Sequence, residues 1–394
     1  MKALIITVGT GVGKSKSTNQ NLTKALTFCI TQHNPDITIF VVSPESKQIA
    51  YQVIKESAIQ KHEIIHIENP DDTQKIFAAL EQKFKQITQN YNNITVDYTS
   101  GTKAMAAALA ILGTTYEVNA LSYITGKREN GIVKPGTEQI KIIRPYFVTA
   151  EKKRQTAIHL FNNNQFNATI TIINQIEKTT TDTTITSKIQ PLKQLARAYA
   201  EWDKFNHRKA FNIITKIHMP ELNLNKKFLG QLLNSKQPEP FYIADLINNA
   251  KRRGTEEQKY DDATARLYRT IELLAQHQLK NKYNIQTSAV DINQLPENLK
   301  QKWQTTQTTS KIKIGLEKAY QLLESKNDAI GTKFSSDNKL KNLLSKRNTS
   351  ILAHGLQPIN KQDYTELYKK TIEYAQLTIQ NLHTLIKEST FIKL

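Results

Sequence analysis

Two residues near the C-terminus, Arg347 and His354, could together carry out acid–base chemistry on a phosphate ester. They stand seven residues apart, which on an α-helix is two turns less about 20°, so a helix over 337–354 would place both on one face. A histidine can move a proton near neutral pH, and an arginine can stabilise charge that develops on a phosphorane. The pair predicts RNA cleavage by the RNA's own 2′-hydroxyl, without a metal ion. The alternative is a solvated arginine and a histidine that caps the helix before Gly355.

A glycine-rich segment over residues 9–15, GTGVGKS, follows the first β-rich run. Glycines let a backbone approach a ligand closely, and a helix that follows offers free N–H groups to an anion. The segment is no P-loop, because the first glycine of that motif would have to stand at position 8, which is Val8. It also fails the dinucleotide-binding fingerprint, because the third glycine of the segment comes one residue too early. A simple turn is the alternative to a ligand loop. The candidate ligand contacts here are Gly9, Thr10, Gly11 and Gly13.

A second loop with small and hydroxylated residues occupies 97–105, DYTSGTKAM, before an alanine-rich helical pattern. Thr102 can cap that helix and Lys103 can reach a phosphate, while a plain N-terminal lysine would be slightly disfavoured by the helix dipole. Ser43, after the second β-rich run, is a further candidate. The candidate contacts from the second loop are Ser100, Gly101, Thr102 and Lys103.

The elements around these loops alternate between β-rich and helical patterns through residues 1–147. Strands are predicted over 4–8, 37–42, 63–67, 94–98 and 120–123, with 141–145 as a last strand. Helices are predicted over 21–33, 47–57, 72–89 and 102–115. This alternation predicts a Rossmann-like α/β fold with a parallel sheet, whose carboxyl edge would carry both loops.

The rest of the chain is predicted to be all-α, as a connecting domain over 148–245 and a bundle over 246–394. The helical segments of the connecting domain are 156–177 and 191–218, separated by a threonine-rich loop over 179–187. Those of the bundle are 261–278, 311–323, 337–354 and 363–386.

Composition limits the protein's class. The 394 residues include 54 Lys and Arg against 35 Asp and Glu, a net charge of +19 that would attract a polyanion or would simply reflect a lysine-rich genome. No run of apolar residues is long enough for a membrane span, and the N-terminal apolar stretch is too short for a signal peptide. The single cysteine, Cys29, excludes an intramolecular disulfide and a zinc site built from cysteines. We therefore expect a cytoplasmic protein without membrane association, cofactor or metal site.

The opening TVGTG, the DYTSGTKAM segment and the strand order together resemble the CARF domain of CRISPR-associated ancillary proteins. Members of that family show Gly-Gly-Thr-Lys in the second motif, where this chain has Ser100-Gly101-Thr102-Lys103. The resemblance implies a homodimer whose two CARF domains share one cyclic oligoadenylate. A two-fold pocket favours an even-numbered ring, and we favour the tetra-adenylate over the hexa-adenylate.

The segment 346–355, KRNTSILAHG, resembles the HEPN ribonuclease motif of an arginine, a polar residue and a histidine, here Arg347, Asn348 and His354. The helical segment 265–276, ARLYRTIELLAQ, resembles the first helix of HEPN domains that follow CARF domains. Within it, Arg266, Arg269 and Glu272 share a face and serve either a substrate groove or surface ion pairs.

The two resemblances together imply a Csm-type CARF–HEPN accessory ribonuclease of type III CRISPR systems, which cleaves single-stranded RNA when cyclic oligoadenylate binds. The alternative is a CARF-type transcriptional regulator without nuclease activity, although no basic recognition helix is evident after residue 150. A P-loop ATPase is disfavoured by the loop spacing. The residues leave open whether the CARF domain also cleaves its activator, and which RNA bases are preferred.

Overall fold

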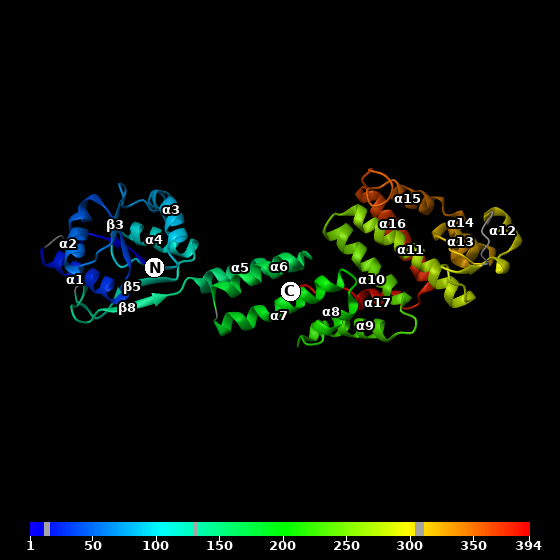
Figure 1. Ribbon diagram of the computed structural model, residues 1–394, viewed down its shortest axis with the longest axis horizontal. Helices are drawn as coiled ribbons and strands as arrows, with labels where there is room; N and C mark the ends of the chain where they lie inside the picture. The colour runs from blue at the N-terminus through cyan, green and yellow to red at the C-terminus, as the bar shows by residue number, and fades with distance from the viewer. Residues whose placement is uncertain (12–15, 130–131, 181, 304–310) are drawn as a thin grey trace. The chain divides into compact units, whose positions relative to one another are not determined.

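The computed structural model describes residues 1–11, 16–129, 132–180, 182–303 and 311–394 (Figure 1). The chain forms two compact units. We call unit 1 the part made of Met1–Arg154 and Ile176–Ile185, and unit 2 the part made of Gln155–Gln175 and Thr186–Leu394. No helix in the described part of the chain is long and apolar enough to cross a membrane.

Unit 1 is built on a six-stranded sheet in the order β3-β2-β1-β4-β5-β8. The strands are β1 (Lys2–Val8), β2 (Ile37–Val42), β3 (His62–His66), β4 (Asn93–Asp97), β5 (Ala120–Thr125) and β8 (Gln139–Ile143). All neighbours are parallel except β8, which runs antiparallel to β5. The five predicted strands of the parallel sheet are confirmed. The predicted strand over 141–145 is also present, two residues earlier, as an antiparallel edge strand after the short pair β6 (Arg128–Glu129) and β7 (Ile132–Val133).

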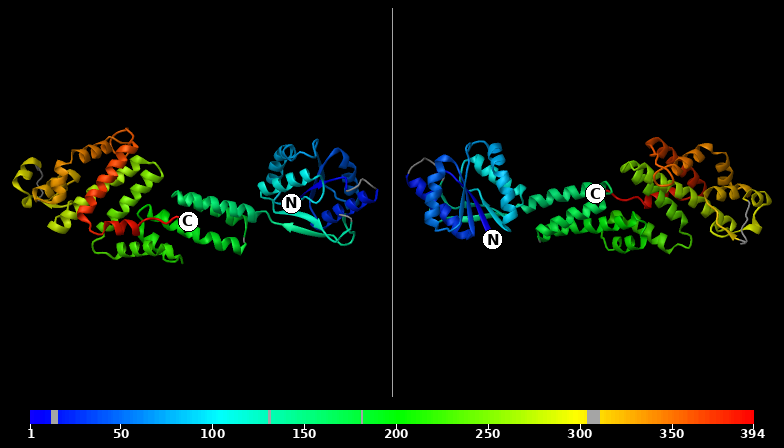
Figure 2. Two further views of the ribbon diagram at one scale, coloured as in Figure 1. Left: turned by 180° about the vertical axis from the view of Figure 1, so that it is seen from behind. Right: turned by 45° about the horizontal axis from the view of Figure 1, so that its top comes forward.

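Helices cover both faces of this sheet (Figure 2). The helices are α1 (Lys16–His33), α2 (Lys47–Ser57), α3 (Thr73–Asn90) and α4 (Lys103–Thr115). Alternate strand residues point to opposite faces, so Ile5 packs with the apolar sides of α3 and α4 while Leu4 and Ile6 pack with those of α1 and α2. The strands are therefore apolar on both sides, as buried parallel strands are.

The middle of the chain is helical, as predicted, but its helices break at different points. They are α5 (Tyr146–Asn162), α6 (Phe166–Thr179), α7 (Thr183–Trp202), α8 (His207–Ile214) and α9 (Asn223–Asn234). The single helix predicted over 156–177 is wrong, because Asn164 adopts a left-handed conformation between α5 and α6. The loop predicted over 179–187 is also largely wrong. The Asp182 carboxylate accepts the N–H of Thr184 at 2.8 Å and so starts α7 inside the threonine-rich stretch.

The C-terminal half of unit 2 is a helical bundle, as predicted, with a small strand pair. Its elements are α10 (Glu239–Lys251), α11 (Tyr260–Tyr283), β9 (Val290–Asp291), α12 (Glu297–Trp303), β10 (Lys311–Ile312), α13 (Leu316–Ser325), α14 (Ala329–Ser336), α15 (Asn338–Asn348), α16 (Lys361–Thr378) and α17 (Leu382–Glu388). The segment predicted as one helix over 363–386 is two helices, and the one predicted over 311–323 begins only at Leu316 because β10 pairs with β9.

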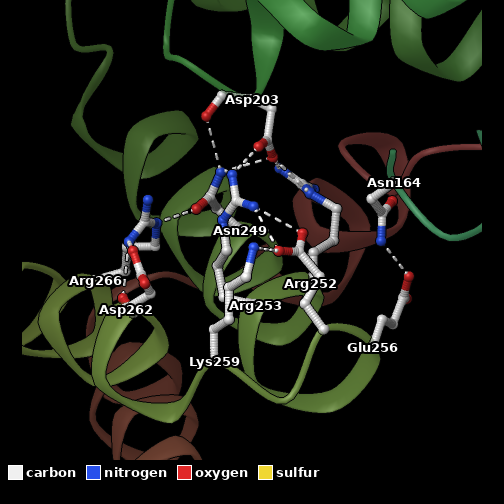
Figure 3. A network of polar contacts seen from close by, with 10 residues as sticks. Asn164, Asp203, Asn249, Arg252, Arg253, Glu256, Lys259, Asp262 and Arg266 are labelled. Atoms are coloured by element: carbon white, nitrogen blue, oxygen red, sulfur yellow. Dashed lines mark hydrogen bonds and ion pairs between the residues drawn. The ribbon is translucent and has the colours of Figure 1, made fainter. Parts of the chain in front are cut away.

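A polar network lies where α7, α10 and α11 meet within unit 2 (Figure 3). Asp203 accepts hydrogen bonds from Asn249 and Arg252, both at 3.0 Å, and pairs with Arg253. Asn249 also accepts from Arg266 of α11, so the network links three helices through buried and half-buried polar groups. The buried Nε of Arg253 has no hydrogen-bond partner among the described residues. The hydrogen bonds that are made favour this packing, because an alternative would leave Asn249 or Asp203 without its partners.

The chain leaves α10 through a π-helical turn, Arg252–Glu256, whose glycine is pressed against an aromatic ring. A Cβ added at Gly254 would lie 2.6 Å from Cε1 of Tyr364 on α16. The hydroxyls of Thr255 and Tyr364 are 3.1 Å apart. The turn therefore packs face to face with the start of α16.

Candidate functional site

The first candidate site is the carboxyl edge of the sheet in unit 1, where the two predicted loops meet. Strands β1 and β4 are adjacent and parallel, so the residues that follow them emerge side by side. The Gly9 N–H donates to Ser100 Oγ at 2.9 Å, and the Thr7 hydroxyl donates to the Ser100 carbonyl. The structure therefore brings Gly9 and Ser100 together, although they are far apart in sequence.

Glycine is required where these loops touch. A Cβ added at Gly9 would lie 2.7 Å from the backbone nitrogen of Gly101, closer than real Cβ atoms come to backbone. Gly101 itself has φ +91° and lies against Thr7 and Met105. Gly11 also has positive φ, at 76°. The loops thus present backbone to whatever binds at the edge, as a phosphate-binding loop does.

The start of α4 adds a cap and a free cation to this edge. Thr102 Oγ1 accepts the N–H of Met105 at 3.1 Å, as predicted for a helix cap, and its hydroxyl donates to the Pro70 carbonyl. Lys103 is exposed and has no ion-pair partner within the described part of the chain. The first turn of a helix leaves N–H groups without an intrahelical partner, so this end is suited to an anion.

The remaining candidates of unit 1 are placed less favourably. Ser43 follows β2 at the same edge, but it is buried, and its N–H donates to Ser46 Oγ at 2.9 Å. Its hydroxyl is 3.4 Å from that of Ser46 and so faces inward along its own turn. Thr10 is half-buried beside Gly9, and Gly13 lies outside the described residues.

The second candidate site surrounds Arg347 and His354 in unit 2, and here the predicted geometry is wrong. Helix α15 ends at Asn348, so the two side chains do not share a helix face. The chain turns instead, with the Ser350 N–H on the Arg347 carbonyl at 3.1 Å and the His354 N–H on the Asn348 carbonyl at 3.1 Å. The turn thereby returns His354 to the end of α15 that bears Arg347 and Asn348.

Gly355 belongs to this turn and does not stop a helix. An added Cβ there would collide with the backbone carbonyl of Thr349, and its N–H bonds the Ser350 carbonyl at 3.3 Å. Ser350 is buried inside the turn, whereas Asn348 and His354 are exposed. The turn therefore exposes the side chains of Asn348 and His354 on a backbone that is closed by hydrogen bonds.

Arg347 is held by an aromatic ring. Its guanidinium carbon lies 4.3 Å from the ring centre of Tyr268 on α11, and its Nη1 is 3.3 Å from Asn348 Oδ1. Its Nε is buried and has no hydrogen-bond partner among the described residues. Burial raises the pKa of Tyr268, and the positive charge of Arg347 opposes that shift. Tyr268 was not among the predicted site residues, because its position opposite Arg347 depends on how α11 packs against α15.

The charged face of α11 forms surface ion pairs. Arg269 Nη1 is 2.6 Å from Glu272 Oε2, and Arg266 Nη1 is 3.2 Å from Asp262 Oδ1. Of the two interpretations that the sequence allowed, the contacts in this structure match the ion-pair one. Among these three arginines, Arg347 is the one without an ion pair in the described part of the chain, and it is the one with a buried nitrogen that lacks a hydrogen-bond partner.

Three family profiles match consecutive segments of the chain. Residues 15–151 match the Card1 CARF domain, residues 149–237 match the Csm6 6H domain, and residues 232–378 match the Csm6 HEPN domain. The chain is a CARF–HEPN protein of the Csm6 family. The HEPN match contains Arg347, Asn348 and His354, whereas the CARF match begins after the loop at Gly9.

A solved structure supports this Csm6-family assignment at the level of the fold. Csm6 of Enterococcus italicus bound to cyclic hexa-2′-fluoro-hexa-dAMP has a TM-score of 0.63 at 14% identity, covering 99% of this chain and 98% of that one. Can2 from Sulfobacillus thermosulfidooxidans, in complex with cyclic tetra-adenylate, covers 55% of this chain and 69% of that one at 11% identity, and its TM-score of 0.26 supports no argument. No curated protein matches the sequence. The predicted fold class, an α/β CARF domain before all-helical domains, is confirmed for this Csm6-family protein.

Proposed function

We propose that this protein is a ribonuclease of type III CRISPR defence that cyclic oligoadenylate activates. In this proposal residues 1–147 sense the ligand, 148–245 connect, and 246–394 cleave single-stranded RNA. The observation that carries it is the turn after α15, which gathers Arg347, Asn348 and His354 at one surface of a HEPN domain. The edge loops of the CARF domain form a second candidate site, whose backbone N–H groups and lysine suit a phosphate ligand.

The chemistry in unit 2 needs a proton carrier and a group that stabilises negative charge. His354 is exposed on its turn and can take the proton of the RNA 2′-hydroxyl or give one to the leaving 5′-oxygen. The guanidinium of Arg347, held beside Tyr268, can donate hydrogen bonds from its terminal nitrogens to the phosphorane oxygens. The products would be a 2′,3′-cyclic phosphate or a 3′-phosphate, and the reaction in this domain requires no metal ion.

A homodimer would complete this site, because a single Arg347 and a single His354 offer few groups to bind and cleave RNA. Three apolar side chains of the same turn are exposed, and Leu356 is 86% exposed. Apolar groups clustered on a surface indicate an interface that is covered in the working protein. A second copy related by a two-fold axis would cover this cluster and bring four catalytic side chains together. The other two apolar side chains are Ile351 and Leu352.

The activator in unit 1 would contact the backbone of Gly9–Gly11 and Gly13, the segment Ser100–Lys103, and the edge of the sheet at Ser43. A two-fold pocket favours a ring with an even number of adenylates. Of the two candidate even rings, we favour the cyclic tetra-adenylate over the hexa-adenylate. The Enterococcus protein holds a hexa-adenylate analogue, so both rings belong in the test.

The test is RNA cleavage by the full-length protein in EDTA, with and without cyclic tetra- or hexa-adenylate. His354→Ala should lose roughly 10²–10⁴-fold in rate while staying folded, because it lacks the proton carrier. His383→Ala is the matched control, since His383 is an exposed histidine of unit 2 away from the turn. A fully active His354→Ala protein would falsify the catalytic assignment.

The same assay separates the remaining alternatives. Ligand binding without any RNA cleavage would favour the regulator over the nuclease. Activity that needs added divalent metal would overturn the metal-free chemistry. Activation by a ring that fades with time in wild type, and returns when fresh ring is added, would show that the protein also cleaves its activator.

A further inference from the structure

A cluster of three potential metal ligands lies inside unit 1, below the edge loops. Cys29 and His33 are four residues apart on α1 and so share a face of that helix. Asp97 is the last residue of β4, one residue before the loop that bears Ser100. One ligand atom from each residue, the thiol sulfur, an imidazole nitrogen and a carboxylate oxygen, lies within 4.8 Å of the other two.

The charge of this cluster is unbalanced in the protein alone. The Asp97 carboxylate is fully buried, and its hydrogen-bond partners are neutral: the Thr99 N–H at 3.0 Å, the Ser122 hydroxyl at 2.7 Å and the Cys29 thiol. Within the described part of the chain, no lysine or arginine pairs with it. A buried carboxylate without a cation is costly, and such groups usually pair with a cation or bind a metal.

A divalent metal ion would remove this imbalance. A thiolate at Cys29 and the carboxylate of Asp97 carry two negative charges, and a neutral His33 adds none, so a 2+ ion makes the buried site neutral overall. Among biological metals, zinc accepts this mixture of sulfur, nitrogen and oxygen ligands. With Zn–S of about 2.3 Å and Zn–N of about 2.0–2.1 Å, tetrahedral ligands stand about 3.5 Å apart, which small side-chain movements can reach from the observed spacing.

We propose that Cys29, His33 and Asp97 bind a zinc ion in unit 1. Ser122 is placed for the fourth position, because its hydroxyl is 3.1 Å from His33 Nε2 as well as close to Asp97. His33 is only half-buried and lies at the end of α1, so the ion can enter from that side. Zinc would fasten the last turn of α1 to the end of β4, directly before the residues that shape the edge loop.

This proposal departs from the expectation that the chain has no metal site. The sequence showed a lone cysteine with a histidine four residues later, and the folded sheet adds an aspartate from a distant strand. It is independent of the proposed nuclease, whose groups lie in unit 2. Binding of the metal must release the thiol proton, so affinity should rise with pH.

The test uses full-length protein purified without chelators, with its metal content measured by inductively coupled plasma mass spectrometry. Wild type should hold stoichiometric zinc, and Co²⁺ in its place should give a sulfur-to-cobalt charge-transfer band. Both signals should be lost in Cys29→Ser and His33→Gln. They should persist in His66→Gln, which changes an exposed histidine at the end of β3.

A second measurement keeps the proposal testable if Cys29→Ser fails to fold. A zinc chelator should lower the Tm of wild type and of His66→Gln, and should leave the Tm of His33→Gln unchanged. Two outcomes would overturn the proposal. One is a wild type that contains no zinc and gives no charge-transfer band with Co²⁺. The other is a His33→Gln protein that binds metal as well as wild type.

Discussion

The edge of unit 1 and the turn of unit 2 are held together in different ways. At the edge, the parts that touch are backbone: the Gly9 N–H bonds Ser100, and the backbones of Gly9 and Gly101 are in contact. At the turn, the backbone is closed on itself and the functional groups are side chains, with Arg347 supported by Tyr268 and His354 exposed. The first arrangement fixes its backbone groups before anything binds, whereas the second displays side chains that, in the proposed function, a second copy of the chain completes.

The largest effect should come from changing the side chain that the turn displays. Arg347→Lys keeps the charge but loses the planar group that can donate two hydrogen bonds to one phosphate. We expect cleavage at saturating activator to fall roughly 10²–10³-fold. Arg269→Lys is the control, because Arg269 already pairs with Glu272 on the surface of α11. An Arg347→Lys protein within a few-fold of wild type would remove Arg347 from the catalytic group.

The second-largest effect should come from forcing apart the backbones of Gly9 and Gly101 at the edge of the sheet. In Gly9→Ala the new Cβ would stand 2.7 Å from the Gly101 nitrogen, so the loops must move apart. Overpacking of this kind costs about 1–3 kcal/mol, which corresponds to roughly 5- to 150-fold in activator affinity. Isothermal titration with the activating ring measures it. Gly315→Ala, where no atom lies within 4 Å of the added Cβ, should leave that affinity unchanged.

A smaller effect should follow from removing Lys103, an exposed cation at this edge. Lys103→Ala removes an exposed ammonium that has no ion-pair partner in the described structure, so little folding stability is at stake. The activator concentration for half-maximal cleavage should rise roughly tenfold, while the maximal rate should hardly change, because the chemistry lies in the other unit. An activation curve that does not move would place the ligand elsewhere.

The smallest effect should come from removing the aromatic ring that contacts Arg347. Tyr268→Leu removes a cation–π contact worth about 0.5–1 kcal/mol, so cleavage should fall roughly two- to fivefold. Tyr268→Phe keeps the ring and should stay near wild type, which separates the ring from its hydroxyl. Equal losses in both variants would show that the hydroxyl, and not the ring face, matters for cleavage.

The sheet of unit 1 was predictable because its signal is local. Buried parallel strands are apolar runs bounded by turns, and each helix carries its own apolar stripe. The meeting of Gly9 with Ser100 could also be anticipated, since both follow strands that end at one edge. The hydrogen bond from the Ser43 N–H to Ser46 could not be predicted, because it depends on the conformation of a four-residue turn.

The turn around His354 was harder to predict because helical periodicity continues past the end of α15. Residues 349–354 carry no proline, so sequence pattern alone favoured one helix through to Gly355. The structure closes the helix with hydrogen bonds from Thr349 and Ser350 back to Lys346 and Arg347. The motif resemblance picked out three residues that the turn places near one another, whereas the helical geometry predicted for two of them was wrong.

The π-helical turn after α10 has a consequence for how this protein can be engineered and how it can drift. Gly254 and the ring of Tyr364 occupy a shared space that admits a side chain from only one of them. A side chain larger than glycine at position 254 would clash with the Tyr364 ring, and a smaller residue at position 364 would leave the space that this side chain needs. Substitutions at the two positions should therefore be tolerated as a pair and rejected singly, so that relatives would covary here. The pair is also a place to build a conditional, temperature-sensitive form of the protein without altering either functional site.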